Sequence, residues 1–178
     1  MTARDAQRAK VYAAEQLVRR IFDRAAQTGC HTLDLHGSRF TLPIERRFAS
    51  VESIQAYAET VLALGWVRAE WARAAVQVQV RSRNGQTRAH YERANATIAI
   101  PPYKGNRAWA MRELVVLHEL AHHPEPDPAA AAHGPAFVHR YALLATEVIG
   151  PEVGLLLRST MHSEGATSAA VVTHGPSL

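Results

Sequence analysis

The chain of 178 residues contains a single cysteine, Cys30, so no disulfide can form within it. One free cysteine agrees with a reducing compartment, and we expect a cytoplasmic protein in which Cys30 is a small buried side chain. We expect no signal peptide, because charged residues interrupt positions 4–10 before an apolar segment can form. Apolar runs fall far short of the roughly 20 residues that a membrane-spanning helix needs, so we expect no membrane partner.

Lysine is also scarce: 18 of the 20 basic residues are arginine, and the formal net charge is +4. This charge only weakly favours nucleic-acid binding. The best candidate patch is Arg81, Arg83, Arg88 and Arg93, which fall in one predicted hairpin. No aromatic residues interleave there to stack on bases, so a solvated sheet face is favoured and nucleic-acid contact is the alternative.

The length suits one domain with a sizeable core, which we place at residues 1–162. Residues 163–178 are rich in Ser, Gly, Ala and Thr, and we predict a disordered tail there.

Hydrophobic periodicity and turn residues predict alternating helices and strands. The predicted helices cover residues 4–27, 51–64, 109–122, a segment from 133 onward, and 153–158. The predicted strands cover residues 31–36, 40–44, 76–81, 87–93 and 97–100. Asn84-Gly85 predicts a tight hairpin between the third and fourth strands, and residues 66–73 are interpreted as a loop.

Residues 118–122 read His-Glu-Leu-Ala-His, an H-E-x-x-H motif in an apolar, helix-compatible run. Residues four apart lie on one face of a helix, so both imidazoles can bind one metal ion, with Glu119 beside it. Chance gives this motif roughly 0.04 times in a chain of this composition, so an amphipathic helix with surface histidines is the alternative. The helical pattern before the motif and the prolines from Pro124 that end the helix favour the metal site.

A catalytic zinc ion usually has three protein ligands and one position for water. We favour His133 as the third ligand, because it follows a ten-residue loop and enters a second helix with Pro135 in its first turn. Glu147, on the same predicted helix, is the competitor.

Other nearby polar residues are less suited to be ligands. His123 points about 100° away from His122 on the helix, so we expect it to face solvent. Glu125 and Asp127 lie in the proline-rich turn and are expected to be solvated charges. His139 is expected to be exposed, and His90 to lie on the surface of its strand.

The motif at residues 118–122, followed by His133-Gly134-x-x-Phe137, resembles the SprT-like zinc metallopeptidases, whose pattern is HExxH and then HGxxF. From Arg4 through residues 109–114 the chain is also similar to a small metallohydrolase family of actinobacteria and their phages. These resemblances cover about residues 4–160. They imply Zn²⁺ bound by His118, His122 and His133, with Glu119 as the catalytic base.

The resemblance also implies the fold: an α+β, small zincin-like domain with a twisted, mostly antiparallel sheet packed on helices. In such a fold an extended peptide can pair with an edge strand, for which residues 96–100 are our candidate. Larger SprT-like proteins often carry a cysteine-rich zinc ribbon. This chain has one cysteine, which argues against a role in cleaving DNA-bound proteins.

We therefore expect a zinc-dependent hydrolase, most specifically a metallopeptidase that acts on a peptide or protein substrate. Tyr103, Arg140 and Tyr141 are candidate donors to the oxyanion. Two alternatives stay open: hydrolysis of a non-peptide amide, and a non-catalytic zinc-stabilised module that binds nucleic acid through the arginine-rich hairpin.

Overall fold

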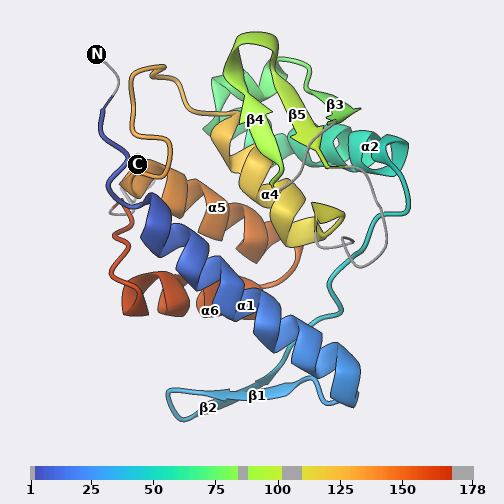
Figure 1. Cartoon of the computed structure of the whole chain (residues 1–178), viewed down its shortest axis with the longest axis vertical. Helices are drawn as coiled ribbons and strands as arrows, with labels where there is room; N and C mark the ends of the chain where they lie inside the picture. The colour runs from blue at the N-terminus through green and yellow to red at the C-terminus, as the bar shows by residue number, and fades with distance from the viewer. Residues whose placement is uncertain (1–2, 84–87, 102–109, 170–178) are drawn as a thin grey trace, which may run out of the picture.

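The computed structural model describes residues 3–83, 88–101 and 110–169, and has mixed α and β structure (Figure 1). The helices are α1 (Arg8–Thr28), α2 (Val51–Leu62), α3 (Gly65–Glu70), α4 (Glu113–His122), α5 (Pro135–Val148) and α6 (Pro151–Ser163). The strands are β1 (Thr32–Leu35), β2 (Ser38–Thr41), β3 (Gln79–Ser82), β4 (His90–Glu92) and β5 (Thr97–Ile100). Short 3-10 turns cover Ala72–Ala75 and Arg93–Asn95. The predicted α+β class is confirmed.

The long N-terminal helix α1 follows from its apolar stripe. Its buried residues recur every three or four positions: Val11, Ala14, Val18, Phe22 and Ala25. The helix ends at Gly29, whose φ of 67° is a left-handed conformation that glycine adopts without strain. α1 packs against α6, and α4 packs against α5. In Figure 1, α1 crosses in front of α5 and α6, and α4 lies above it.

The sheet order differs from the prediction. β5 lies in the centre of a three-stranded sheet, parallel to β3 and antiparallel to β4. The predicted direct pairing of the third and fourth strands is therefore wrong, and Asn84-Gly85 lies outside the described residues. The predicted edge strand at 96–100 is also wrong, because all four residues of β5 are buried between two neighbours. β3 and β4 form the edges.

Three local predictions also need correction. Residues 66–73 are not a loop: α3 and a 3-10 turn cover most of them, because Val67 and Ala74 are buried anchors. Cys30 is exposed, since it lies in the connection after α1, next to the β1–β2 hairpin that projects from the helices (Figure 1). The last helix extends well beyond the expected 153–158 at both ends.

Part of the predicted tail, residues 163–169, is described by the structure. Ser163 belongs to α6, and the Thr167 N–H donates to Gln7 Oε1 at 2.5 Å. The Ala169 N–H donates to the Pro135 carbonyl at 2.9 Å. Residues 170–178 lie outside the described residues, and the domain boundary at 162 stays a prediction. Within the described ranges, no helix combines the length and apolar character needed to cross a membrane.

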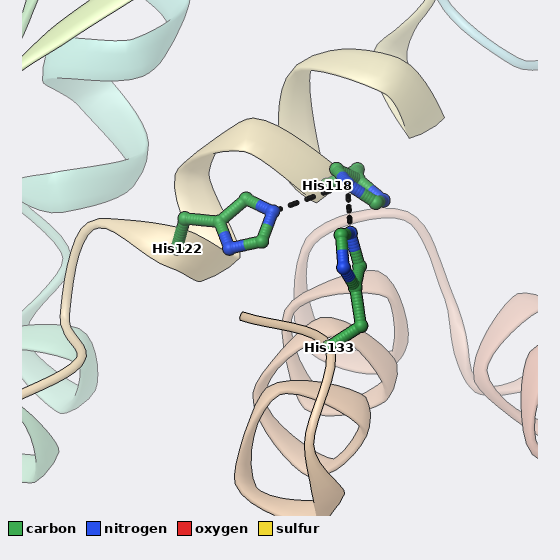
Figure 2. A group of neighbouring side chains, drawn as sticks. All are labelled: His118, His122 and His133. Atoms are coloured by element: carbon green, nitrogen blue, oxygen red, sulfur yellow. Dashed lines mark hydrogen bonds between the residues drawn. The ribbon is translucent and has the colours of Figure 1, made fainter. Parts of the chain in front are cut away.

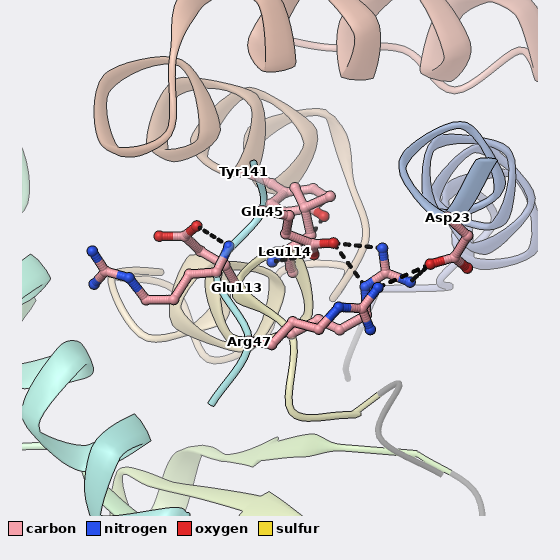
Figure 3. Close-up of polar contacts among 8 residues, drawn as sticks. Asp23, Glu45, Arg47, Glu113, Leu114 and Tyr141 are labelled. Atoms are coloured by element: carbon pink, nitrogen blue, oxygen red, sulfur yellow. Dashed lines mark hydrogen bonds and ion pairs between the residues drawn. The ribbon is translucent and has the colours of Figure 1, made fainter. Parts of the chain in front are cut away.

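A polar cluster holds the N-terminus of α4 (Figure 3). Arg112 is 2% exposed and donates to Glu45 Oε2 at 2.8 Å and to Asp23 Oδ1 at 2.8 Å. Glu45 also accepts the Leu114 N–H, one of the free N–H groups of the first helical turn, at 3.3 Å. Glu113 accepts the Arg46 N–H at 3.1 Å. These contacts position the start of α4, and with it residues 118–122.

Candidate metal centre

Three histidines converge between α4 and α5. His118 and His122 lie on α4, and His133 precedes Gly134, the N-cap of α5, with Pro135 in the first turn. Their ligand nitrogens all lie within 4.8 Å of one another. His118 Nε2 lies 3.2 Å from His122 Nε2 and 3.4 Å from His133 Nε2. Figure 2 shows the three rings turned toward one another, with these two contacts as dashed lines. His118 and His133 are buried, and His122 is half-buried. The structure thus brings together the three predicted ligands.

Two carboxylates from the N-terminal segment contact the outer nitrogens of these rings. Glu15, on α1, contacts His118 Nδ1. Asp5 Oδ2 lies 2.7 Å from His133 Nδ1, and Asp5 Oδ1 accepts the His133 backbone N–H at 3.2 Å. A carboxylate that holds the outer N–H of an imidazole fixes its tautomer and orientation, as in carboxylate–histidine–metal sites.

These contacts test whether the site fits a metal ion. In each of His118 and His133, the Nδ1 atom carries a proton that it donates to a carboxylate. In the neutral rings, the two Nε2 atoms therefore have lone pairs that face each other. A positive charge, either a metal ion or a proton, must then lie between them. Two nitrogens bound tetrahedrally at about 2.0–2.1 Å from zinc are about 3.3 Å apart. The two separations from His118, 3.2 and 3.4 Å, match this spacing, and the ligand atoms of all three histidines lie within 4.8 Å of one another, so the donor set fits an ion such as zinc.

The environment favours neutral imidazoles at two of the three positions. Burial is the main cause that lowers the pKa of His122 and His133 below the ordinary histidine value. Burial also acts to lower the pKa of His118, but the Glu15 and Glu119 carboxylates together outweigh it and the pKa is raised. A metal ion at this site would therefore displace a proton mainly from His118.

Glu119 lies beside the three histidines and is 4% exposed. Burial raises the pKa of its carboxyl group to about 7, while the charge of His118 and a hydrogen bond from the Tyr91 backbone act in the opposite direction. A carboxylate with a pKa near neutrality can both accept and return a proton. This is the property that a general base at the predicted position requires.

Tyr12, on α1, is a site residue that the sequence analysis missed. Its ring centroid lies 5.6 Å from that of His118 and 5.2 Å from that of His133. Burial and the nearby Glu119 carboxylate raise the pKa of its phenol. Within the described part of the chain its hydroxyl makes no hydrogen bond, so it is available as a donor.

Two of the three predicted oxyanion donors already donate hydrogen bonds to other groups of the protein. Tyr141 is buried and donates to the Leu114 carbonyl at 3.2 Å. Arg140 donates to the Ala121 carbonyl at 2.9 Å and to Glu125 at 2.7 Å. Tyr103 lies outside the described residues. Glu125 is therefore ion-paired, and the prediction of a solvated charge was wrong.

We predicted that His123 faces solvent. This is wrong, because its exposed fraction is 0%. Its Nδ1 accepts the Tyr91 hydroxyl at 2.8 Å, and its Nε2 donates to the Val76 carbonyl at 3.0 Å. The reason is that β4 and the segment before β3 cover the end of α4. Burial lowers the pKa of His123 to about 4.

Among the described residues, the remaining candidates do not join the group of three converging histidines. Glu147, the competing third ligand, is exposed and lines a different cavity beside α2. His139 is half-buried. His90 is half-buried rather than free on the surface, with Nδ1 at 2.8 Å from Arg83 and Nε2 at 2.9 Å from Glu92.

The four arginines of the predicted hairpin do not form one exposed patch. Arg81 pairs with Glu92 at 2.5 Å, and Arg83 donates to the Arg88 carbonyl at 3.2 Å. Arg93 donates to the carbonyls of Glu125 and Pro126. Arg88 instead lies over the Tyr12 ring, with its guanidinium carbon 4.4 Å from the centroid.

Two cavities meet at the candidate site. The first has a volume of about 820 Å³ and is lined by α1, Arg88, His118 and Glu119. The second has a volume of about 400 Å³ and is lined by β4, Glu119, His122 and His133. The residues that border both are Asp5, Arg8, Tyr12, Ala89 and Glu119. A ligand therefore has access to Glu119 from two sides.

Comparison with protein-family models, with curated proteins and with solved structures finds no match for this chain. The metal and the chemistry must therefore be inferred from the donor set, its burial and its hydrogen bonds.

Proposed function

We propose that this protein is a zinc-dependent hydrolase, and specifically a metallopeptidase with a SprT-like, zincin-like domain. The observation that carries the proposal is the convergence of three imidazole nitrogens next to the buried Glu119, with Asp5 and Glu15 orienting two of the rings. A site with a purely structural metal has no need of a buried carboxylate with a pKa near 7. His118, His122 and His133 would hold the metal.

When bound, zinc supplies a Lewis acid that lowers the pKa of water and polarises a carbonyl group. Glu119 accepts the proton of the attacking water on its carboxylate and passes it to the nitrogen of the leaving amine. Tyr12 donates its hydroxyl hydrogen to the oxygen on which negative charge develops. Asp5 and Glu15 keep His133 and His118 in the tautomers that leave Nε2 free to bind.

The variant Glu119→Gln tests this proposal, since it removes the base but keeps the size of the side chain. We expect its turnover of casein or a mixed peptide substrate to fall by a factor of about 10²–10⁴. Zinc content, measured by atomic emission, should stay at the wild-type value. Peptide products are followed by mass spectrometry.

Two controls accompany this variant. Glu147→Gln changes an exposed glutamate of the same type away from the site and should leave turnover unchanged. His133→Ala should lose zinc and turnover together. Equal peptide turnover in the wild type and in Glu119→Gln contradicts the proposed role of Glu119. Cleavage of simple non-peptide amides in place of peptides favours the alternative substrate class.

A further inference from the structure

The first cavity extends the candidate site along α1. Its volume of about 820 Å³ lies within the range of sites that enclose small ligands, roughly 300–1,000 Å³. His118 and Glu119 line one part of its wall, and Arg4, Arg8 and Arg88 line another. A substrate whose reacting bond lies at Glu119 can therefore place an adjacent group among these arginines.

The charges of this cavity are unbalanced. Its carboxylates already have roles, since Asp5 and Glu15 contact His133 and His118, and Glu119 is the proposed base. Arg4, Arg8 and Arg88 are exposed, and none of them contacts a carboxylate among the described residues. The cavity thus presents three guanidinium groups that form no ion pair with its own carboxylates.

The second cavity differs in this respect. Arg140 is ion-paired with Glu125 at 2.7 Å. Arg93 donates to two backbone carbonyls. Arg8 borders both cavities, but Arg4 and Arg88 line the first cavity and not the second, so the first offers a ligand more guanidinium groups that the protein does not already bind.

Arg88 is placed close to the metal ligands by stacking. Its guanidinium lies 4.4 Å from the centroid of Tyr12, and that ring in turn contacts His118. Arg8 lies over the same ring at 5.8 Å. A stacked guanidinium loses little freedom when it binds, and its planar N–H groups match a carboxylate in a bidentate arrangement.

We propose that the first cavity binds a carboxylate of the substrate through Arg88 and Arg8, so that the site selects peptides with a negative charge next to the scissile bond. This inference rests on the proposed hydrolase function. The carboxylate belongs either to an acidic side chain or to the free C-terminus of a short peptide. Both present the same group to the arginines.

The test measures binding, separately from turnover, to zinc-loaded Glu119→Gln protein. Three dansylated hexapeptide pools, randomised without Asp or Glu at the other positions, are compared. One has a fixed Glu and an amidated C-terminus, one a fixed Gln and a free C-terminus, and one a fixed Gln and an amidated C-terminus. By fluorescence anisotropy we expect about tenfold tighter binding of a carboxylate-bearing pool than of the uncharged pool.

Variants in the same background locate the effect. Arg88→Gln and Arg8→Gln should each remove most of the preference, and Arg88→Lys should keep part of it, because lysine retains charge but not bidentate geometry. Arg20→Gln, an exposed arginine of α1 that does not line this cavity, is the matched control and should bind like its parent. Circular dichroism and zinc content check that every variant folds.

The outcomes separate the two proposals. Equal binding of all three pools, or a preference that survives in Arg88→Gln and Arg8→Gln, overturns the carboxylate site. If wild type cleaves the pools without such a preference, the hydrolase function stands and this inference fails. If the preference is present but wild type cleaves none of them, the carboxylate site stands and the hydrolase function fails. Arg88-dependent binding of single-stranded DNA, without discrimination among the pools, overturns the proposal in favour of nucleic acid.

Discussion

Among single residues, two carboxylates far away in sequence orient two of the three histidines proposed as ligands. Asp5 contacts both the ring and the backbone N–H of His133. Glu15 contacts the ring of His118. Because each carboxylate holds Nδ1–H, each leaves Nε2 free for the proposed metal.

We predict that Asp5→Asn and Glu15→Gln each weaken zinc binding by roughly 10–100-fold, because the amides no longer hold the imidazoles as charged acceptors. Competition against a chromogenic zinc chelator measures the affinity. Asp34→Asn, which changes an exposed aspartate of β1 that pairs with Arg39, is the control and should bind zinc like wild type. Unchanged affinity in both site variants would show that the histidines are oriented by packing alone.

His123 gives a second prediction, on pH and stability. Burial lowers its pKa to about 4, so its neutral form is favoured in the folded protein. Its contribution to the free energy of unfolding is therefore complete above pH 6.5 and is lost as the pH falls toward 4.

We expect the stability difference between wild type and His123→Gln, measured by urea unfolding, to shrink by about 2 kcal/mol between pH 7 and pH 4.5. Both proteins should be studied without zinc, so that metal release does not contribute. A constant difference over this range would mean that His123 titrates normally despite its burial.

At the scale of elements, β4 takes the place that the sequence analysis gave to residues 96–100. β5 has partners on both sides, whereas β4 is an edge strand that borders the second cavity next to His122 and Glu119. A proline at Ala99 would therefore not test strand pairing at an edge, because it would disrupt the central strand of the sheet. An extended peptide can add to β4 instead through its backbone N–H and C=O groups.

If a substrate pairs with β4 in this way, peptides that lack selected backbone N–H groups should be cleaved more slowly. We predict that N-methylation at single positions near the scissile bond lowers kcat/KM by roughly fivefold where a hydrogen bond of about 1 kcal/mol is lost. A series of N-methylated peptides, with methylation far from the scissile bond as control, measures this by mass spectrometry. A uniform response along the series would argue against strand pairing.

At the scale of the whole molecule, the proposed metal would join three helical segments. His118 and His122 belong to α4 and His133 leads into α5, while the N-terminal segment and α1 supply Asp5 and Glu15. Gln7 connects further parts, since its amide contacts the His133 carbonyl at 3.3 Å and the Thr167 carbonyl at 3.2 Å. Binding of zinc to the folded protein alone should therefore stabilise the whole arrangement.

We predict that zinc at about 100 times its Kd adds roughly 2.7 kcal/mol to the free energy of unfolding. For a domain of this size the increase corresponds to a rise in Tm of about 5–10 °C. Differential scanning fluorimetry with and without zinc measures the shift. His133→Ala should show little of it, and an equal shift in that variant would place the zinc elsewhere.

The local parts of this protein could be predicted from its amino-acid sequence. The apolar periodicity of α1, the helix through residues 118–122 with its proline stop, and the entry of His133 into a helix at Pro135 all depend on neighbours within a few turns. The relative positions of His118, Glu119 and His122 follow from helical geometry alone. His133 could be predicted as the third ligand because it lies where the next helix begins. The same local patterns also indicated mixed α and β structure.

The contacts that join distant segments could not be predicted from the sequence, because they depend on the tertiary structure. Glu15 and His118 are 103 positions apart, and Asp5 and His133 are 128 apart, so no local pattern links them. In the sequence, the only sign of Glu15 and Tyr12 as site residues is that a polar and an aromatic residue border the apolar stripe of α1. The central place of β5 and the burial of His123 likewise depend on which strand packs beside which, because burial is a property of the assembled layers and not of the helix or strand alone.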